Sequence, residues 1–255
     1  MTDPGTQPGA PAHRAGASPP AHAEADGTGS APYLDLPVGE FLQALSAPTP
    51  APGGGSAAAI TVALAASLCA MTARISTPQL SAGNEAGAAE IRAEAGAEGI
   101  VARAGAAGIG AGAAAAGIVP EAGAAGIVAE AQRLRERAAP LAQADAEAYR
   151  AVITAFRDRE QSVGGALSAA STVPMEVAEI GARVAALAAT IAQRGNPNVR
   201  GDAITAALLA AAGSGAASEL VRINLAQASG EGRPAQAQQF ASEAAGHAAV
   251  ASARR

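Results

Sequence analysis

Hydrophobic residues recur at the three- and four-residue spacing of α-helices through most of the chain after residue 32. The clearest pattern begins at Thr172 and Pro174, which suit a helix start, and ends before Gly195, which suits the position after a helix. Its apolar face comprises Val173, Val177, Ile180, Val184, Leu187 and Ile191. Further patterns predict helices over residues 38–45, over 130–157 with a kink at Pro140, from the capping residue Asp202 to about 227, and from Pro234 onward.

A segment beginning near Ser56 is apolar on all sides, as a central buried helix would be. The composition agrees with this interpretation, because 77 of the 255 residues are Ala and only 5 are aromatic. Alanine has the highest helix propensity, and its small side chain lets helices approach closely. We therefore predict an all-α fold: an orthogonal bundle of five or six helices around a buried, Ala-rich central helix.

Two segments lack such a pattern. Residues 1–32 are rich in Pro, Gly and Ala and predict a disordered tail before a helical domain over residues 33–255. Residues 81–129 carry a Gly-Ile pair every nine residues, ending at Gly126-Ile127. Nine residues turn a helix by about 900°, so successive Ile side chains fall on opposite faces and build no core stripe. We expect this segment to be a low-complexity surface insert.

The charges restrict the partners and the compartment. All 17 basic residues are Arg, no run of like charges occurs and the net charge is −5, so a nucleic-acid-binding surface is not expected. The most apolar stretch, residues 57–73, is shorter than a membrane span and predicts a buried helix instead. Cys69 is the only cysteine, which favours a cytoplasmic protein. His247 and Cys69 stand alone, so no metal site is expected.

The chain Pro52-Gly53-Gly54-Gly55-Ser56 leads directly into the predicted buried helix. Bare glycine amides at a helix start form a site for an anion or a carbonyl oxygen, because the N–H groups and the helix dipole point outward there. The alternative is a flexible hinge that ends in an ordinary Ser cap.

Asp145 falls on the apolar stripe of its predicted helix, between Leu141 and Ala148. Burial of an unpaired carboxylate is costly, so such a group either finds hydrogen-bond donors or has a raised pKa. A raised pKa suits a general acid or base near neutral pH. The alternative is that Asp145 caps a neighbouring helix.

Further polar residues stand between or within apolar helices. Asn196, Asn198 and Asp202 lie in one loop and helix start, and Asn224 lies near the end of the following helix. These side chains offer both donors and acceptors, and a buried Asn must be paired. Loop and capping roles are the alternative for the first three.

Several of these motifs, in this order, resemble the cyclodeaminase/cyclohydrolase family. They are Phe41-Leu42-Gln-Ala-Leu45-Ser, Pro48-Thr-Pro-Ala-Pro-Gly-Gly-Gly-Ser56, Ser171-Thr-Val-Pro174-Met-Glu-Val-Ala178, Gly195-Asn-Pro-Asn198 with Asp202-Ala203, and Ile223-Asn224-Leu225. The family includes formiminotransferase-cyclodeaminase and methenyltetrahydrofolate cyclohydrolases. The resemblance implies an all-helical fold that forms a homodimer or larger homo-oligomer, a tetrahydrofolate derivative as substrate, and no other cofactor.

The resemblance also implies the chemistry and its residues. In the cyclodeaminase reaction N10 of the folate attacks the carbon carried by N5 and ammonia leaves, and in the cyclohydrolase reaction water attacks the same bridging carbon. One carboxylate beside that carbon would transfer protons, and Asp145 and Asp202 are the candidates. Residues Gly53, Gly54, Gly55 and Ser56 would line the pocket, and Asn196, Asn198 and Asn224 would bind the pterin. Arg200, with Arg74 or Arg222 as alternatives, would meet the glutamate carboxylate.

The chain departs from the family at one point. Members commonly carry a Lys-containing segment after the buried helix, whereas this chain has no Lys and continues into the nine-residue repeat. A second hypothesis is therefore a helical scaffold or interaction protein that keeps the family's fold without its catalysis.

Overall fold

A computed structural model describes residues 31–82, 123–158, 163–226 and 231–253. The chain divides into two units, Met1–Ala31 and Pro32–Arg255. Almost all of the first unit, which holds the predicted tail, and residues 83–122 of the predicted insert lie outside the described residues.

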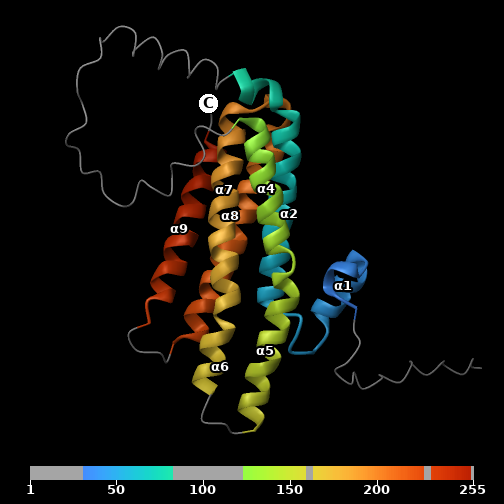
Figure 1. Ribbon diagram of the computed structural model, residues 1–255, viewed down its shortest axis with the longest axis vertical. Coiled ribbons are helices and arrows are strands. Elements are labelled where there is room, and N and C mark those ends of the chain that lie inside the picture. Colours follow the sequence, from blue (N-terminus) through green and yellow to red (C-terminus); the bar gives the residue numbers. More distant parts are fainter. Residues whose placement is uncertain (1–30, 83–122, 159–162, 227–230, 254–255) are drawn as a thin grey trace, which may run out of the picture. The chain divides into compact units, whose positions relative to one another are not determined.

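The described residues contain helices and no β-strand, which confirms the all-α prediction. The helices with bounds in the described residues follow one another along the chain (Figure 1), and residues 77–82 are helical as well. Their bounds are η1 Tyr33–Asp35, α1 Val38–Ser46, α2 Gly54–Ile75, α4 Ala124–Ala138, α5 Leu141–Arg157, α6 Val163–Ala170, α7 Thr172–Arg194, η2 Pro197–Val199, α8 Arg200–Asn224 and α9 Arg233–Ser252.

Helix α7 packs against α8 and α9, while α2 packs against α8 and α4. The long helices run side by side along one direction in Figure 1, so the expected orthogonal crossing is wrong. The core explains this arrangement, since most of its buried residues are Ala, with a few larger side chains such as Ile127, Leu134, Ile180 and Ile191. Side chains this small let neighbouring helices stay close along their length instead of crossing over a few large side chains.

Helix α8 packs closely on α2 at a glycine, Gly213. A Cβ atom on Gly213 would lie 2.5 Å from Cγ2 of Val62 and 3.2 Å from the carbonyl oxygen of Ala58. Val62 is fully buried and β-branched, so it has little freedom to move away. The contact between these two helices therefore depends on the missing side chain.

Gly213→Ala is expected to lower the free energy of unfolding by about 1–3 kcal/mol, because it overpacks the contact with α2. Gly215 lies two residues further along α8 and has open space where its Cβ would stand, so Gly215→Ala is the matched control. It is expected to raise stability by up to about 1 kcal/mol through helix propensity. Denaturant unfolding of both variants measures the difference, and equal effects would contradict the packing explanation.

Most of the predicted helices are confirmed, and the α7 stripe from Val177 to Ile191 is buried. The division of residues 130–157 into α4 and α5, and the separate helix α6, were not predicted. The chain breaks at Pro140 into α4 and α5, because proline lacks the N–H that a continuous helix needs, and α6 forms a helix of its own. Phe156, an apolar residue near the end of α5, is 59% exposed.

The predicted boundaries at two places are wrong. Helix α4 begins at Ala124, inside the expected insert, and Ile127 of the last repeat unit is 1% exposed in the core. Asp202 is not a cap, because α8 begins at Arg200 and places Asp202 in its first turn. A repeat and a capping residue are local signals. The packing of α4 against α2 brings the last repeat unit into the core. Helix α8 starts two residues before the predicted cap, Asp202.

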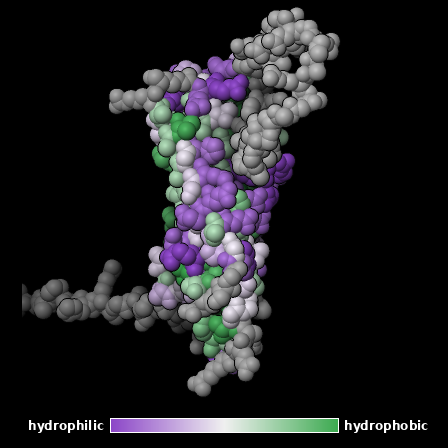
Figure 2. Space-filling model, turned by 90° about the vertical axis from the view of Figure 1, so that its left-hand side faces the viewer, coloured by the Kyte–Doolittle hydropathy of each residue, from purple (hydrophilic) through white to green (hydrophobic). Residues whose placement is uncertain are grey.

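Helix α2 is not buried all round as predicted. Its outward face carries Leu64, which is 58% exposed, and the neighbouring α8 exposes Leu208 at 51%. Helix α2 and the segment Pro197–Asn224 are long and apolar enough to cross a membrane, although about half of each is buried within the bundle, as in core helices of soluble proteins. In Figure 2 the side facing the viewer is largely hydrophilic over its middle, and hydrophobic residues gather toward its left edge.

Candidate functional site

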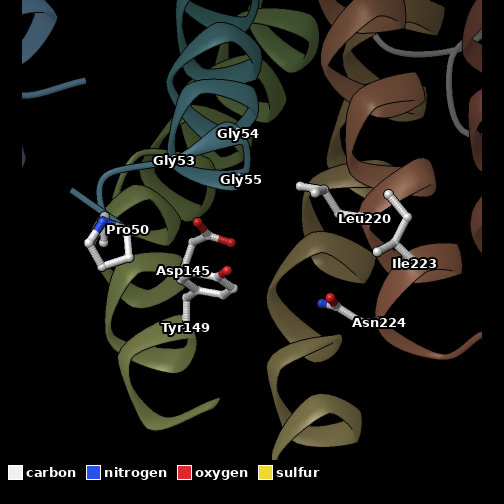
Figure 3. Close-up of a pocket in the computed structure, with 10 residues that line it drawn as sticks. Pro50, Gly53, Gly54, Gly55, Asp145, Tyr149, Leu220, Ile223 and Asn224 are labelled. Carbon is white, nitrogen blue, oxygen red and sulfur yellow. The ribbon is translucent and has the colours of Figure 1, made fainter. Parts of the chain in front are cut away.

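A cavity of about 300 Å³ opens where the start of α2, the middle of α5 and the end of α8 meet (Figure 3). This volume is at the lower end of the range for small-molecule sites. The cavity is lined by Pro50, Ala51, Gly53, Gly54, Gly55, Asp145, Tyr149, Leu220, Ile223 and Asn224. Polar groups from α2 and α5 therefore face a largely apolar wall from α8.

The carboxylate of Asp145 projects from α5 toward the first turn of α2 (Figure 3). It packs directly on the backbone of Gly55, where a Cβ atom would stand within 2.5 Å of Oδ2 and closer still to Oδ1. Its Oδ2 atom also lies 3.3 Å from Oγ of Ser56. Gly55 is therefore needed because the carboxylate of another helix occupies the space of its side chain.

Opposing effects set the protonation of Asp145. Burial raises the pKa of its carboxyl group, and hydrogen bonds from the side chain and the backbone N–H of Ser56 lower it. The effect of burial is the larger, so the net pKa lies above the ordinary value of an aspartate. The carboxyl group can thus hold or accept a proton nearer to neutral pH than an exposed aspartate can.

The two alternatives for Asp145 are both present in the structure. The carboxylate meets the amide of Ser56 in the first turn of α2, which is the contact of a capping residue contributed by another helix. It also lines the cavity and has a raised pKa, which capping alone does not require. The helix start expected to bind an anion therefore already faces a carboxylate of the protein.

The predicted pocket residues of the α2 start divide into two groups. Gly53, Gly54 and Gly55 line the cavity. Ser56 is 0% exposed and does not line it, so the prediction of direct substrate contact by Ser56 is wrong. Ser56 is also not the cap of α2, which is Gly53, because the helix starts two residues earlier than predicted.

Asn224, which we expect to bind the pterin, lines the cavity from the last residue of α8. Tyr149 was not predicted. It lies one helical turn after Asp145, is 45% exposed, and its ring lies beside the carboxylate in Figure 3. The i, i+4 spacing from Asp145 was the available signal, since it places both side chains on one face of a helix.

The remaining predicted residues lie at the opposite end of α8. The backbone N–H of Asn196 donates to Oγ of Ser76 at 2.9 Å, which places this loop at the end of α2. Asp202 is exposed in the first turn of α8, roughly 33 Å along the helix from Asn224 at 1.5 Å per residue. Within one chain, the prediction that Asn196, Asn198, Arg200 and Asp202 join the glycine segment is therefore wrong.

Local contacts explain several of these polar side chains. Asn196 accepts a hydrogen bond from the backbone N–H of Asn198 at 2.9 Å, as in an Asx turn. Arg200 donates to the carbonyl oxygens of Ala251, in the last turn of α9, and Ala253, its C-cap, at 3.1 and 2.7 Å. Arg222 pairs with Glu219 of its own helix at 2.7 Å. Arg74 is exposed in the last turn of α2, at the end remote from the cavity.

The described part of the chain holds no cluster of three or more His, Cys, Asp or Glu side chains that could bind a metal ion. Burial raises the pKa of the Cys69 thiol to about 12, so this thiol is uncharged at neutral pH. Among the cavity-lining residues, Asp145 and Tyr149 are the titratable side chains. Proton transfer by Asp145 is therefore the chemistry that the cavity residues support best.

Comparison with known proteins shows the family and the fold of this chain. The profile of the formiminotransferase-cyclodeaminase family matches residues 37–102 and 120–243. The crystal structure of formiminotetrahydrofolate cyclodeaminase from Thermotoga maritima superimposes with a TM-score of 0.64 at 23% sequence identity, covering 86% of this chain and 94% of that one. No curated protein matches the chain by sequence. The family profile spans most of the chain, which therefore belongs to the formiminotransferase-cyclodeaminase family.

Proposed function

We propose that this protein is a folate enzyme that acts at the carbon between N5 and N10 of tetrahydrofolate, as a formiminotetrahydrofolate cyclodeaminase or a methenyltetrahydrofolate cyclohydrolase. The observation that carries the proposal is Asp145, a carboxyl group with a raised pKa that lines a 300 Å³ cavity beside the family's glycine segment. The reaction needs the folate substrate and no separate cofactor.

Asp145 is the proton carrier in this proposal. In the cyclodeaminase direction a bond forms from N10 to the formimino carbon, and the carboxylate takes the N10 proton and passes it to the departing amine, which leaves as ammonia. In the cyclohydrolase direction it takes a proton from the attacking water and returns it to N5 as the bond between N5 and the carbon breaks. The second proton of the water goes to solvent, and the product carries a formyl group on N10. Both tetrahedral intermediates carry the same bridging carbon, so one carboxylate position serves either reaction. A negative charge beside that carbon also stabilises the methenyl cation.

The cavity suits one edge of a reduced pterin. The side chain of Asn224 offers a donor and an acceptor, and the exposed N–H groups at the start of α2 offer donors. Leu220 and Ile223 form an apolar wall on the α8 side, with the Tyr149 ring across the cavity (Figure 3). A planar ring between these walls would bury its faces while its edge forms hydrogen bonds.

We propose that the active protein is a homodimer joined through the outward faces of α2 and α8. Leu64 and Leu208, near the middle of these helices, are more than half exposed, and such an apolar face is typical of a subunit interface. Helices α2 and α8 run antiparallel, since the cavity joins the start of α2 to the end of α8. A two-fold axis across the middle of this face would bring Asp202 and Asn198 of each chain to its partner's cavity. This arrangement accounts for site residues that one chain holds apart.

The competing hypothesis, a scaffold without catalysis, predicts no folate binding. Folinic acid at 100 times its Kd is expected to stabilise an enzyme of this family by about 2.7 kcal/mol, because it binds only the folded state. For a chain of this size the expected rise in melting temperature is roughly 5–10 °C. Differential scanning fluorimetry measures the shift, and the decay of methenyltetrahydrofolate absorbance then measures turnover.

p-Aminobenzoylglutamate, which lacks the pterin, is the control ligand and is expected to give a much smaller shift. No shift with folinic acid at saturating concentration would contradict the proposal and support the scaffold. A rise in melting temperature without decay of the methenyl absorbance would exclude the cyclohydrolase reaction. The cyclodeaminase reaction would remain, and ammonia release from formiminotetrahydrofolate tests it directly.

A further inference from the structure

Ser56 lies behind the carboxylate of Asp145, on the side away from the cavity. It is fully buried, so it reaches neither solvent nor a ligand in the cavity. Its hydroxyl oxygen lies 2.7 Å from the carbonyl oxygen of Ala142 and 3.3 Å from Oδ2 of Asp145, and its one hydrogen can be donated to either acceptor. Both partners belong to α5 and are three residues apart, so one hydroxyl group connects the start of α2 to one face of α5.

The carboxylate is thereby held on two sides. Gly55 leaves it no room to move toward α2, and Ser56 contacts its Oδ2 atom. The backbone N–H of Ser56 also bonds to the carboxylate. Rotation of the Asp145 side chain would break these contacts together, so the pair Gly55-Ser56 determines where the carboxylate stands.

We propose that Ser56 is a positioning residue that holds the Asp145 carboxylate in place for proton transfer. The inference rests on the proposed function for its catalytic meaning, but the Ser56 and Asp145 contact can be tested without a substrate. When its hydrogen points to Oδ2, the hydroxyl stabilises the charged form of the carboxylate against the effect of burial. Its removal leaves burial less opposed, so the pKa of Asp145 is expected to rise.

Another buried serine provides a matched control. Ser214 of α8 is also fully buried, and its hydroxyl donates to the carbonyl oxygen of Ala178 on α7 at 2.9 Å. Ser56→Ala and Ser214→Ala therefore each remove one buried hydroxyl that bonds to the backbone of a neighbouring helix. Only Ser56→Ala also removes a contact with a carboxylate.

The experiment is a titration of the ligand-free full-length protein labelled with 13C at the aspartate carboxyl groups, in which Asp145→Asn assigns the signal. Besides Asp145, Tyr149 is the only cavity-lining residue with an ionisable side chain, since α2 and α8 contribute Gly53, Gly54, Gly55, Leu220, Ile223 and Asn224. Ser56→Ala is expected to move the Asp145 midpoint to higher pH, and Ser56→Cys, with a weaker donor, to give an intermediate midpoint. Ser214→Ala is expected to leave it unchanged.

A common midpoint in the wild type and Ser56→Ala would overturn the proposal, and so would an equal shift in Ser214→Ala. Where the protein turns over its folate substrate, Ser56→Ala is expected to lower kcat with little change in KM and to move the pH profile in the same direction as the midpoint. A protein that lacks turnover but shows the shift would contradict the proposed function while leaving the Ser56 contact intact.

Discussion

Asp145→Asn is expected to lower kcat for the folate substrate by about 10²- to 10⁴-fold, because Asn cannot accept or release a proton at neutral pH. The amide has the same shape as the carboxyl group and can still meet the first turn of α2, so KM is expected to change little. Steady-state assays of the wild type and the variant measure both constants. Turnover equal to that of the wild type would show that Asp145 is not the proton carrier.

The pH dependence of stability separates loss of function from loss of fold in this variant. Burial raises the pKa of Asp145 in the folded chain, so between the ordinary and the raised pKa the folded chain binds more protons than the unfolded chain. Its contribution to the free energy of unfolding therefore falls as pH rises through that interval. Asp145→Asn lacks this dependence and is expected to be at least as stable as the wild type at neutral pH, as denaturant unfolding at several pH values would show.

Asp202→Asn tests the dimer that we propose. Asp202 is exposed at the far end of α8, so a site within one chain would leave this variant fully active. If the partner's Asp202 completes each cavity, both single variants lose activity, and mixing them restores one intact site in each mixed dimer. Random reassociation of equal amounts is expected to recover about a quarter of wild-type activity, because half of the dimers are mixed and each has one intact site.

Each variant refolded only with itself is the control and is expected to recover nothing. Wild-type activity of Asp202→Asn alone would contradict the proposed dimer, in which Asp202 reaches the partner's cavity. It would leave the role of Asp145 unchanged.

Gly55→Ala is expected to lower kcat by about 10²-fold, although the substitution adds only one carbon atom. The new Cβ would overlap the Asp145 carboxylate, which must rotate away from Ser56, and a displacement of about 1 Å can cost 10²-fold in rate. Overpacking is also expected to reduce the free energy of unfolding by about 1–3 kcal/mol. Kinetics and denaturant unfolding measure the two effects.

Gly54→Ala is the matched variant, because a Cβ at Gly54 meets no atom within 4 Å. It is expected to keep kcat and the pKa of Asp145, with any effect confined to KM, since Gly54 lines the cavity. A loss of kcat in Gly54→Ala as large as that in Gly55→Ala would mean that helix propensity or cavity shape, and not the position of the carboxylate, explains the loss.

The order of apolar and polar residues was enough to predict most of the helices, and the motifs between Phe41 and Leu225 were enough to show the resemblance to the family. The buried face of α7 from Val177 to Ile191 follows from three- and four-residue spacing alone, because a helix presents such residues on one side. The glycines Gly53, Gly54 and Gly55 and the position of Asp145 on an apolar stripe also drew attention to residues that line the cavity. These are local signals, and local signals are what a sequence pattern carries.

Tertiary packing alone decided which of the polar residues meet. The contact of Asp145 with Gly55 and Ser56 joins residues about 90 positions apart, and no periodicity within α5 or α2 encodes it. The same packing turned Ser56 away from the cavity, brought Tyr149 into it and left Asp202 at the other end of α8. A helix pattern determines the face on which a side chain lies, whereas the neighbouring helix that receives that face depends on how all the helices pack.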